Sequence, residues 1–184
     1  RSQRTSGFLT PQPGFSARRG AELGLAYYQT LGRSFDTTFF LDLSSEEYFG
    51  FGNEFRYQPS AETGGLFEGY IIDDPLVGEV RWKVELAHRS VDLPFGMRGI
   101  VLIEDVSDFE FYRDFERRIR NFSRRQLYST AYLTGNWGRQ SLNILIDQRK
   151  LFLTVGEDPV IFRQLPELDY KLRSTRVGRS PLYV

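Results

Sequence analysis

The chain contains 184 residues, in which 24 Lys and Arg balance 24 Asp and Glu, so the formal net charge is zero. This balance argues against nucleic-acid binding, which requires a basic excess, and an aromatic content of 15% argues against intrinsic disorder. The absence of cysteine excludes disulfides and thiolate metal sites within the chain. The 16 Phe and 10 Tyr suit pleated, half-buried surfaces and therefore favour strands.

Regular alternation of apolar and polar residues is the main pattern along the chain, and it predicts long antiparallel strands. Side chains of a strand alternate between its two sides, so each such segment has one apolar and one charged face. In the clearest segment, Val80, Trp82 and Val84 alternate with Arg81 and Lys83. In chain order, the predicted strands cover residues 19–30, 35–44, 49–58, 65–73, 80–89, 98–106, 126–134, 140–149 and 160–172.

Short turn motifs separate the predicted strands. Examples are Leu31-Gly32-Arg33-Ser34, Asp73-Asp74-Pro75 and Leu93-Pro94-Phe95-Gly96. One stretch, residues 107–121, is aromatic and charged without strict alternation, and it predicts either a short helix or an extended loop. The motif Gly50-x-Gly52 lies inside a predicted strand, where small residues mark a bend or a close approach to the backbone.

The predicted strands are about 9–11 residues long, as a tilted crossing of a bilayer requires, whereas soluble sandwiches more often use strands of about 5–6 residues. Aromatic residues near strand ends, such as Tyr57 and Trp137, resemble the girdles at membrane interfaces. We therefore predict an all-β fold, an antiparallel up-and-down meander of about 8–10 long strands that forms part of a transmembrane β-barrel. Alternation does not show which face meets water, so a passive porin and a soluble β-sandwich binding module remain alternatives.

Candidate site residues are the charged positions on the polar faces of the strands and one basic cluster. The polar positions are predicted to line an aqueous lumen, and the basic cluster to contact anionic lipid phosphates. The lumen-lining candidates are Asp36, Glu54, Arg56, Arg81, Lys83 and Glu85. The basic cluster consists of Arg117, Arg118, Arg120, Arg124 and Arg125.

Catalytic chemistry has little support in the sequence. The one histidine, His88, stands at the end of a predicted strand and continues its apolar face. Its neighbours Ser90 and Asp92 lack the orienting context of a catalytic triad. We therefore predict no catalytic residue, no metal site, no cofactor and no enzymatic activity.

Six short motifs, taken in chain order, carry a resemblance to a known family. They are Ser6-Gly7-Phe8-Leu9-Thr10-Pro11, Ala26-Tyr27-Tyr28, Asp36-Thr37-Thr38, Asn53-Glu54-Phe55-Arg56-Tyr57, residues 107–115 (SDFEFYRDF) and Gln164-Leu165-Pro166-Glu167-Leu168. In this order, over nearly the whole chain, they resemble the barrel part of the LptD (OstA) family of lipopolysaccharide-assembly proteins.

The resemblance implies an integral outer-membrane β-barrel that translocates and assembles lipopolysaccharide. Residues 1–184 would form a single segment, the N-terminal part of the barrel domain, with a periplasmic jellyroll domain and later strands outside it. Implied partners are lipopolysaccharide, membrane lipids, an LptE-like lipoprotein plug and a periplasmic LptA-like bridge that acts through the upstream domain. No nucleic acid is expected.

The resemblance also implies a lateral seam at the first strands, which the family is thought to weaken with two prolines. Proline lacks the N–H that a ladder hydrogen bond needs. Pro11 matches the first of these prolines, and Ala26 stands where the second is expected. Pro13 is a further candidate for weakening the same strand.

Overall fold

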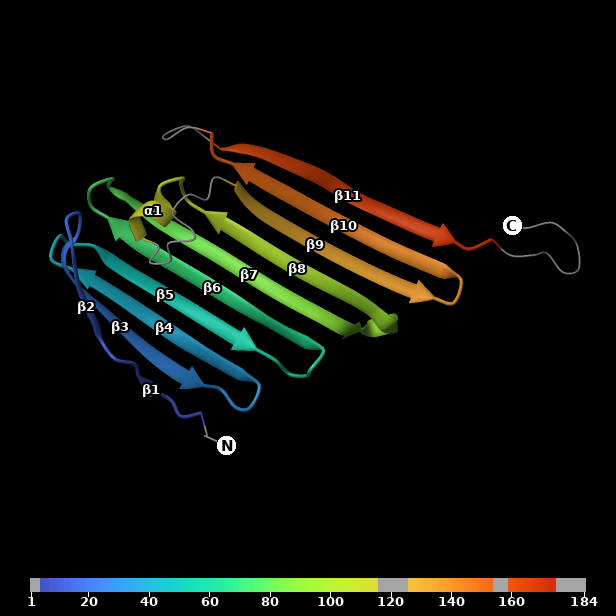
Figure 1. Cartoon of the computed structure of the whole chain (residues 1–184), viewed down its shortest axis with the longest axis horizontal. Coiled ribbons are helices and arrows are strands. Elements are labelled where there is room, and N and C mark those ends of the chain that lie inside the picture. Colours follow the sequence, from blue (N-terminus) through green and yellow to red (C-terminus); the bar gives the residue numbers. More distant parts are fainter. Residues whose placement is uncertain (1–3, 116–125, 154–158, 175–184) are drawn as a thin grey trace, which may run out of the picture.

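A computed structural model of the chain describes residues 4–115, 126–153 and 159–174. One antiparallel sheet contains all the strands of the described residues, and one short helix lies over it (Figure 1). The strands are β1 (Gly7–Phe8), β2 (Gln12–Ser16), β3 (Gly20–Thr30), β4 (Phe35–Ser44), β5 (Phe49–Tyr57), β6 (Thr63–Asp74), β7 (Glu79–Leu93), β8 (Met97–Val106), β9 (Gln126–Trp137), β10 (Gln140–Leu151) and β11 (Val160–Leu172). The α-helix is α1 (Phe111–Phe115), and a 3-10 helix, η1 (Pro94–Gly96), joins β7 to β8.

From β3 to β11, each strand pairs antiparallel with the next one along the chain. These strands lie in chain order across Figure 1 and have between 9 and 15 residues. Their positions confirm the predicted meander of long strands. Helix α1 confirms a short helix within the stretch that lacks alternation. Among the described residues, no helix is long and apolar enough to span a membrane.

The first edge of the sheet consists of two short pieces, β1 and β2, which both pair with β3. Phe8 lies opposite Tyr27, and Gln12 lies opposite Gly24. The three residues between Phe8 and Gln12 therefore face only two residues of β3, which makes this a β-bulge. The Leu9 N–H donates to the Ala26 carbonyl at 2.8 Å within the bulge. β1 and β2 were not among the predicted strands, because they are short and the residues between them include Pro11.

The two faces of the sheet differ in what covers them. We define the apolar face by its exposed hydrophobic side chains, which include Phe39, Phe49, Phe51, Ile71 and Val80. The polar face carries the residues that alternate with these along each strand. They include Asp36, Glu54, Glu68, Arg81 and Lys83. Phe51 is 42% exposed, whereas Arg81 is 4% exposed. A soluble two-layer protein covers its apolar face, so this sheet has the opposite arrangement.

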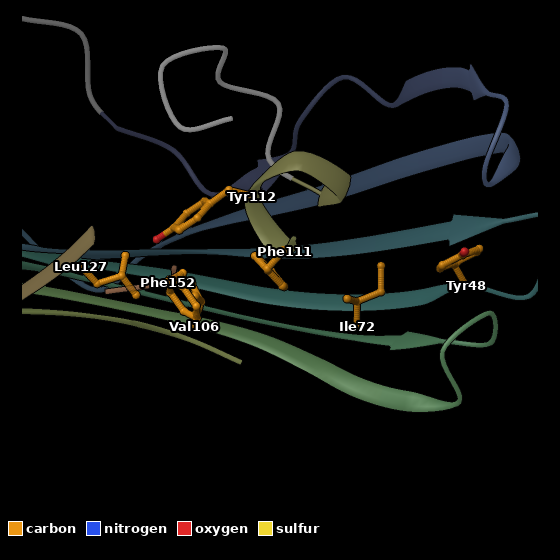
Figure 2. Packing of buried hydrophobic residues seen from close by; sticks show 7 residues of the cluster. All are labelled: Tyr48, Ile72, Val106, Phe111, Tyr112, Leu127 and Phe152. Carbon is orange, nitrogen blue, oxygen red and sulfur yellow. The ribbon is translucent and has the colours of Figure 1, made fainter. Parts of the chain in front are cut away.

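The hydrophobic core of the described residues is a small cluster around α1. It consists of Tyr48, Ile72, Val106, Phe111, Tyr112, Leu127 and Phe152. Figure 2 shows Phe111 below the α1 ribbon and Ile72 on the strands beside it. Phe111 also packs against Phe115 at 5.4 Å and against Tyr70 at 6.3 Å between ring centroids. These aromatic contacts dock α1 on the sheet.

Glycines in β5 and β6 allow two tyrosine rings to cross a neighbouring strand. Tyr70 lies over Gly50 and Gly52, and its hydroxyl donates to Asp42 Oδ2 at 2.8 Å on β4. The Gly50-x-Gly52 motif therefore marks a close approach of a side chain to the backbone, which was one of the two roles predicted for it. Tyr57 lies over Gly65 in the same way, and its hydroxyl is 2.5 Å from His88 Nδ1 on β7.

Replacing Gly65 by Ala is expected to destabilise the sheet by about 1–3 kcal/mol, the usual cost of overpacking. An added Cβ would lie 2.5 Å from the Tyr57 ring and 2.7 Å from the Ala87 carbonyl oxygen, and the backbone oxygen has no room to move away. Urea unfolding of the folded protein measures the loss. Gly14→Ala is the control, because its Cβ would meet Glu22 at an ordinary 3.8 Å. Equal stability of the two variants would contradict the prediction.

Candidate functional site

An arginine–aspartate cluster joins α1 to the polar face. It consists of Arg18, Asp74, Arg81, Asp108 and Asp114. Arg81 Nη1 donates to Asp74 Oδ2 at 3.0 Å and to Asp114 Oδ2 at 2.9 Å, while its Nε donates to Asp108 Oδ2 at 2.8 Å. Arg18 donates to the same Asp74 and Asp114 oxygens, each at 2.9 Å. Each of these two carboxylates is therefore held by two guanidinium groups.

The cluster gathers four separate segments of the chain. Arg18 lies in the turn before β3, Asp74 ends β6, Arg81 lies on β7, and Asp108 and Asp114 belong to the segment around α1. The Asp74 side chain is fully buried, so its charge depends on these partners. The motif Asp73-Asp74-Pro75 was predicted to be a turn. The chain does turn there: Asp74 ends β6, its carbonyl accepts from the Gly78 N–H at 2.8 Å, and its Oδ1 accepts from the Leu76 N–H at 3.1 Å. The sequence did not show that the Asp74 side chain is also a buried, central member of the cluster.

Aromatic rings of α1 complete the surroundings of the cluster. The Arg81 guanidinium carbon lies 4.7 Å from the centroid of the Phe115 ring and 5.9 Å from that of Phe111. The guanidinium carbon of Arg19 also lies over the Phe115 ring, 5.6 Å from its centroid. Cation–π attraction strengthens when the cation is shielded from water, as Arg81 is here. The charges and the rings together hold α1 against β6 and β7.

Acid is expected to loosen α1 through Asp108. Burial by itself would raise the pKa of this carboxyl, but hydrogen bonds from Arg81 and from the Ser107 hydroxyl outweigh burial and lower the pKa. A lowered folded pKa means that ionised Asp108 stabilises the fold above its unfolded pKa of about 4. This stabilisation is lost as the pH falls from that value through the lower folded pKa.

The NMR chemical shift of the Trp82 backbone amide, whose N–H donates to the Ser107 hydroxyl at 3.1 Å, monitors this segment between pH 7 and pH 2. Asp108→Asn is expected to flatten the acid transition, because the titrating group is gone. Asp73→Asn, which removes an exposed carboxylate of β6, is the control. An Asp108→Asn profile identical to that of the unmodified protein would refute the assignment.

The middle of the polar face contains a second ion-pair group and a cavity. Lys83 Nζ lies 2.6 Å from Glu68 Oε1 and 3.8 Å from Glu85 Oε1. A cavity of about 290 Å³ lies between this group, α1 and the bulge at the sheet edge. Its lining includes Leu9, Thr10, Ala26, Glu68, Lys83 and Phe111. The cavity thus connects the interrupted first strand with the middle of the polar face.

The end of the polar face away from α1 has an open hollow of about 1140 Å³. It lies beside the β3–β4 and β5–β6 turns, and we call it the open-end hollow. Asp36 lies at its wall, with Oδ2 2.9 Å from Arg4 Nη1 and Oδ1 2.7 Å from Arg56 Nε. Arg56 also lies 3.3 Å from Glu54.

The structure places all six lumen-lining candidates on the polar face and divides them among three ion-pair groups. Asp36, Glu54 and Arg56 form the group at the open-end hollow, Lys83 and Glu85 the middle group, while Arg81 belongs to the arginine–aspartate cluster. Of the gate candidates, Pro11 lies in the bulge, Pro13 lies in β2, and Ala26 lines the cavity. The basic cluster Arg117, Arg118, Arg120, Arg124 and Arg125 lies outside the described residues.

Sequence reasoning missed most partners of Arg81. Asp108 and Asp114 stand in the motif 107–115, which was noted for its resemblance and not for its charges. Arg18 had no signal, because its partner Asp114 lies 96 residues away along the chain. Within the described ranges, no group of three or more His, Asp or Glu side chains could hold a metal ion.

Comparison with known proteins shows relatives that share one name. "LPS-assembly protein LptD" of Cupriavidus necator is 29% identical over 168 residues, which cover 91% of this chain and 20% of that protein. The protein of the same name from Ralstonia nicotianae is 31% identical over 138 residues, covering 73% of the chain and 17% of the relative. The protein of the same name from Legionella pneumophila (strain Paris) is 27% identical over 187 residues, which cover 90% of this chain and 22% of that protein. No family model matches the chain.

Fold and site together define a class of protein: a long-stranded antiparallel meander with a covered polar face and an exposed apolar face, as in transmembrane β-barrels. The relatives give the family. The chain belongs to the LptD family and spans about a fifth of the length of the curated relatives it matches.

Proposed function

We propose that the chain forms part of an outer-membrane β-barrel that assembles lipopolysaccharide at the cell surface. The observation that carries this proposal is the reversed burial of the sheet: ion pairs and α1 cover its polar face, and Phe-rich strands expose its apolar face. Such a sheet suits a bilayer outside and a polar lumen inside. The name shared by the relatives supplies the substrate, lipopolysaccharide.

The edge formed by β1 and β2 supports a lateral seam for release into the membrane. Its pairing with β3 is interrupted by the bulge that contains Pro11, and Pro13 cannot donate a backbone hydrogen bond. An interrupted ladder is easier to open than a continuous one. The cavity at Ala26 lies directly inside this edge, so an opened seam would connect the membrane with the polar face.

The proposed role is non-enzymatic. It also involves partner proteins that bind the longer protein of which this chain forms a part. We propose an LptE-like lipoprotein within the lumen and an LptA-like periplasmic bridge that delivers lipopolysaccharide. The ion-paired side chains of the polar face would offer a plug protein a surface to contact, and the open-end hollow would give it room.

Depletion of the protein from its host cell distinguishes this function from a passive porin. We expect lipopolysaccharide to disappear from the cell surface and to accumulate in inner compartments, measured by surface labelling of intact cells. Uptake of small hydrophilic solutes is expected to stay the same or rise. Normal surface lipopolysaccharide together with reduced solute uptake would overturn the proposal and favour a channel.

A further inference from the structure

We propose that the open-end hollow binds phosphate groups, which we take to be those of lipopolysaccharide; this source rests on the proposed function. Four arginines and two carboxylates supply the charges of the lining: Arg4, Arg33, Arg56, Arg89, Asp36 and Glu62. Positive charge is therefore in excess in a wide hollow that is open to solvent.

Among the described residues, the middle and the α1 end of the polar face have the opposite balance. In the middle, Lys83 faces the carboxylates of Asp42, Glu68 and Glu85 around the same strands. At the α1 end, two arginines meet three aspartates in the arginine–aspartate cluster. An anion on the polar face is therefore repelled from the middle and attracted to the open-end hollow.

Two of the arginines are held in place and two are available. Asp36 is nearly buried and fixes Arg4 and Arg56, one on each carboxylate oxygen. Within the part of the chain that the structure describes, the exposed side chains of Arg33 and Arg89 form no ion pair and no hydrogen bond. A guanidinium group presents a planar fork of donors that matches two phosphate oxygens. The hollow thus combines two arginines that Asp36 holds in place with two whose guanidinium groups can donate to a bound phosphate.

The test compares binding of three probes to the full-length protein in zwitterionic detergent. The probes are purified lipopolysaccharide, the same lipopolysaccharide after chemical removal of its phosphates, and inorganic pyrophosphate. The variant is the double substitution Arg33→Gln and Arg89→Gln, which removes the two unpaired donors. Arg139→Gln is the matched control: it is an exposed arginine at the same end of the sheet, in the β9–β10 turn, outside the lining.

We expect the double variant to bind phosphorylated lipopolysaccharide about tenfold more weakly, as two exposed charge pairs of roughly 0.7 kcal/mol each would give. Binding of the dephosphorylated form is expected to be unchanged, and Arg139→Gln is expected to bind both forms normally. High salt should reduce the difference between the two forms, because these charges are exposed.

The outcomes separate this inference from the proposed function. Equal binding of both lipopolysaccharide forms to the unmodified protein, or no effect of the double variant, overturns the phosphate site and leaves the assembly role standing. Arginine-dependent binding of pyrophosphate without binding of either lipopolysaccharide form supports a phosphate site and contradicts the assembly role. An equal loss for both forms in the double variant also overturns the phosphate site.

Discussion

Replacing Arg81 by Met is expected to lower the free energy of unfolding by about 3–5 kcal/mol, the usual cost of removing one partner from a buried ion pair. Asp74 and Asp114 would remain largely shielded from water and would each lose one of the two guanidinium groups that hold them, keeping that of Arg18, whose side chain is 30% exposed. Cation–π contacts with Phe111 and Phe115 would be lost as well. The segment around α1 is therefore expected to separate from β6 and β7.

Two measurements check this prediction in the detergent-solubilised protein. Urea unfolding gives the change in stability, and limited proteolysis between Ser107 and Phe115 reports the release of α1. Arg89→Met is the control, because Arg89 lies on the same strand and the same face but is exposed. Similar losses in both variants would show that the cluster does not hold α1 in place.

Replacing Phe51 by Arg is expected to destabilise the protein in a lipid bilayer by about 2 kcal/mol. A basic residue on the lipid face of a barrel costs about 2–4 kcal/mol at the midplane and about 0–1 kcal/mol at the interfaces, and Phe51 lies two residues inside the start of β5. Phe51 is 42% exposed and stacks on Phe39 with 6.4 Å between ring centroids. If this face met water instead, an arginine there would be nearly neutral, as surface substitutions usually are.

Folding into liposomes at increasing urea concentrations measures this effect. Phe51→Leu is the matched control, since it keeps an apolar side chain, and it is expected to cost less than about 1.5 kcal/mol. The proposal of a lipid-facing apolar side would be refuted if Phe51→Arg folded as well as Phe51→Leu, or if the Arg variant became stable without detergent or lipid.

Most of the long strands were predictable because their signal is local. Each of these segments has a period of two, and residues 80–86, which contain Arg81 and Lys83, show it without exception. The first edge was not predictable in this way. Only five residues form β2 and two form β1, and the bulge at Pro11 shifts the alternation between them.

The candidate site was predictable as a set of charged positions and not as a set of contacts. Alternation places Asp36 and Arg56 on one face, and pairing of β4 with β5 brings them directly opposite each other. Asp114, in contrast, reaches Arg18 and Arg81 only because α1 folds back over the sheet. No local pattern encodes a contact between segments so far apart in the chain.

The alternating sequence determined that the chain forms two-faced strands and in which order they follow one another, because strand geometry sends successive side chains to opposite sides. It left open which face would be covered, since a sandwich and a barrel share the same period. The tertiary structure decided that question. It buries Arg81 and Asp74 beneath α1 and leaves Phe51 and Ile71 exposed, because one buried ion-pair cluster joins four distant segments on the polar face.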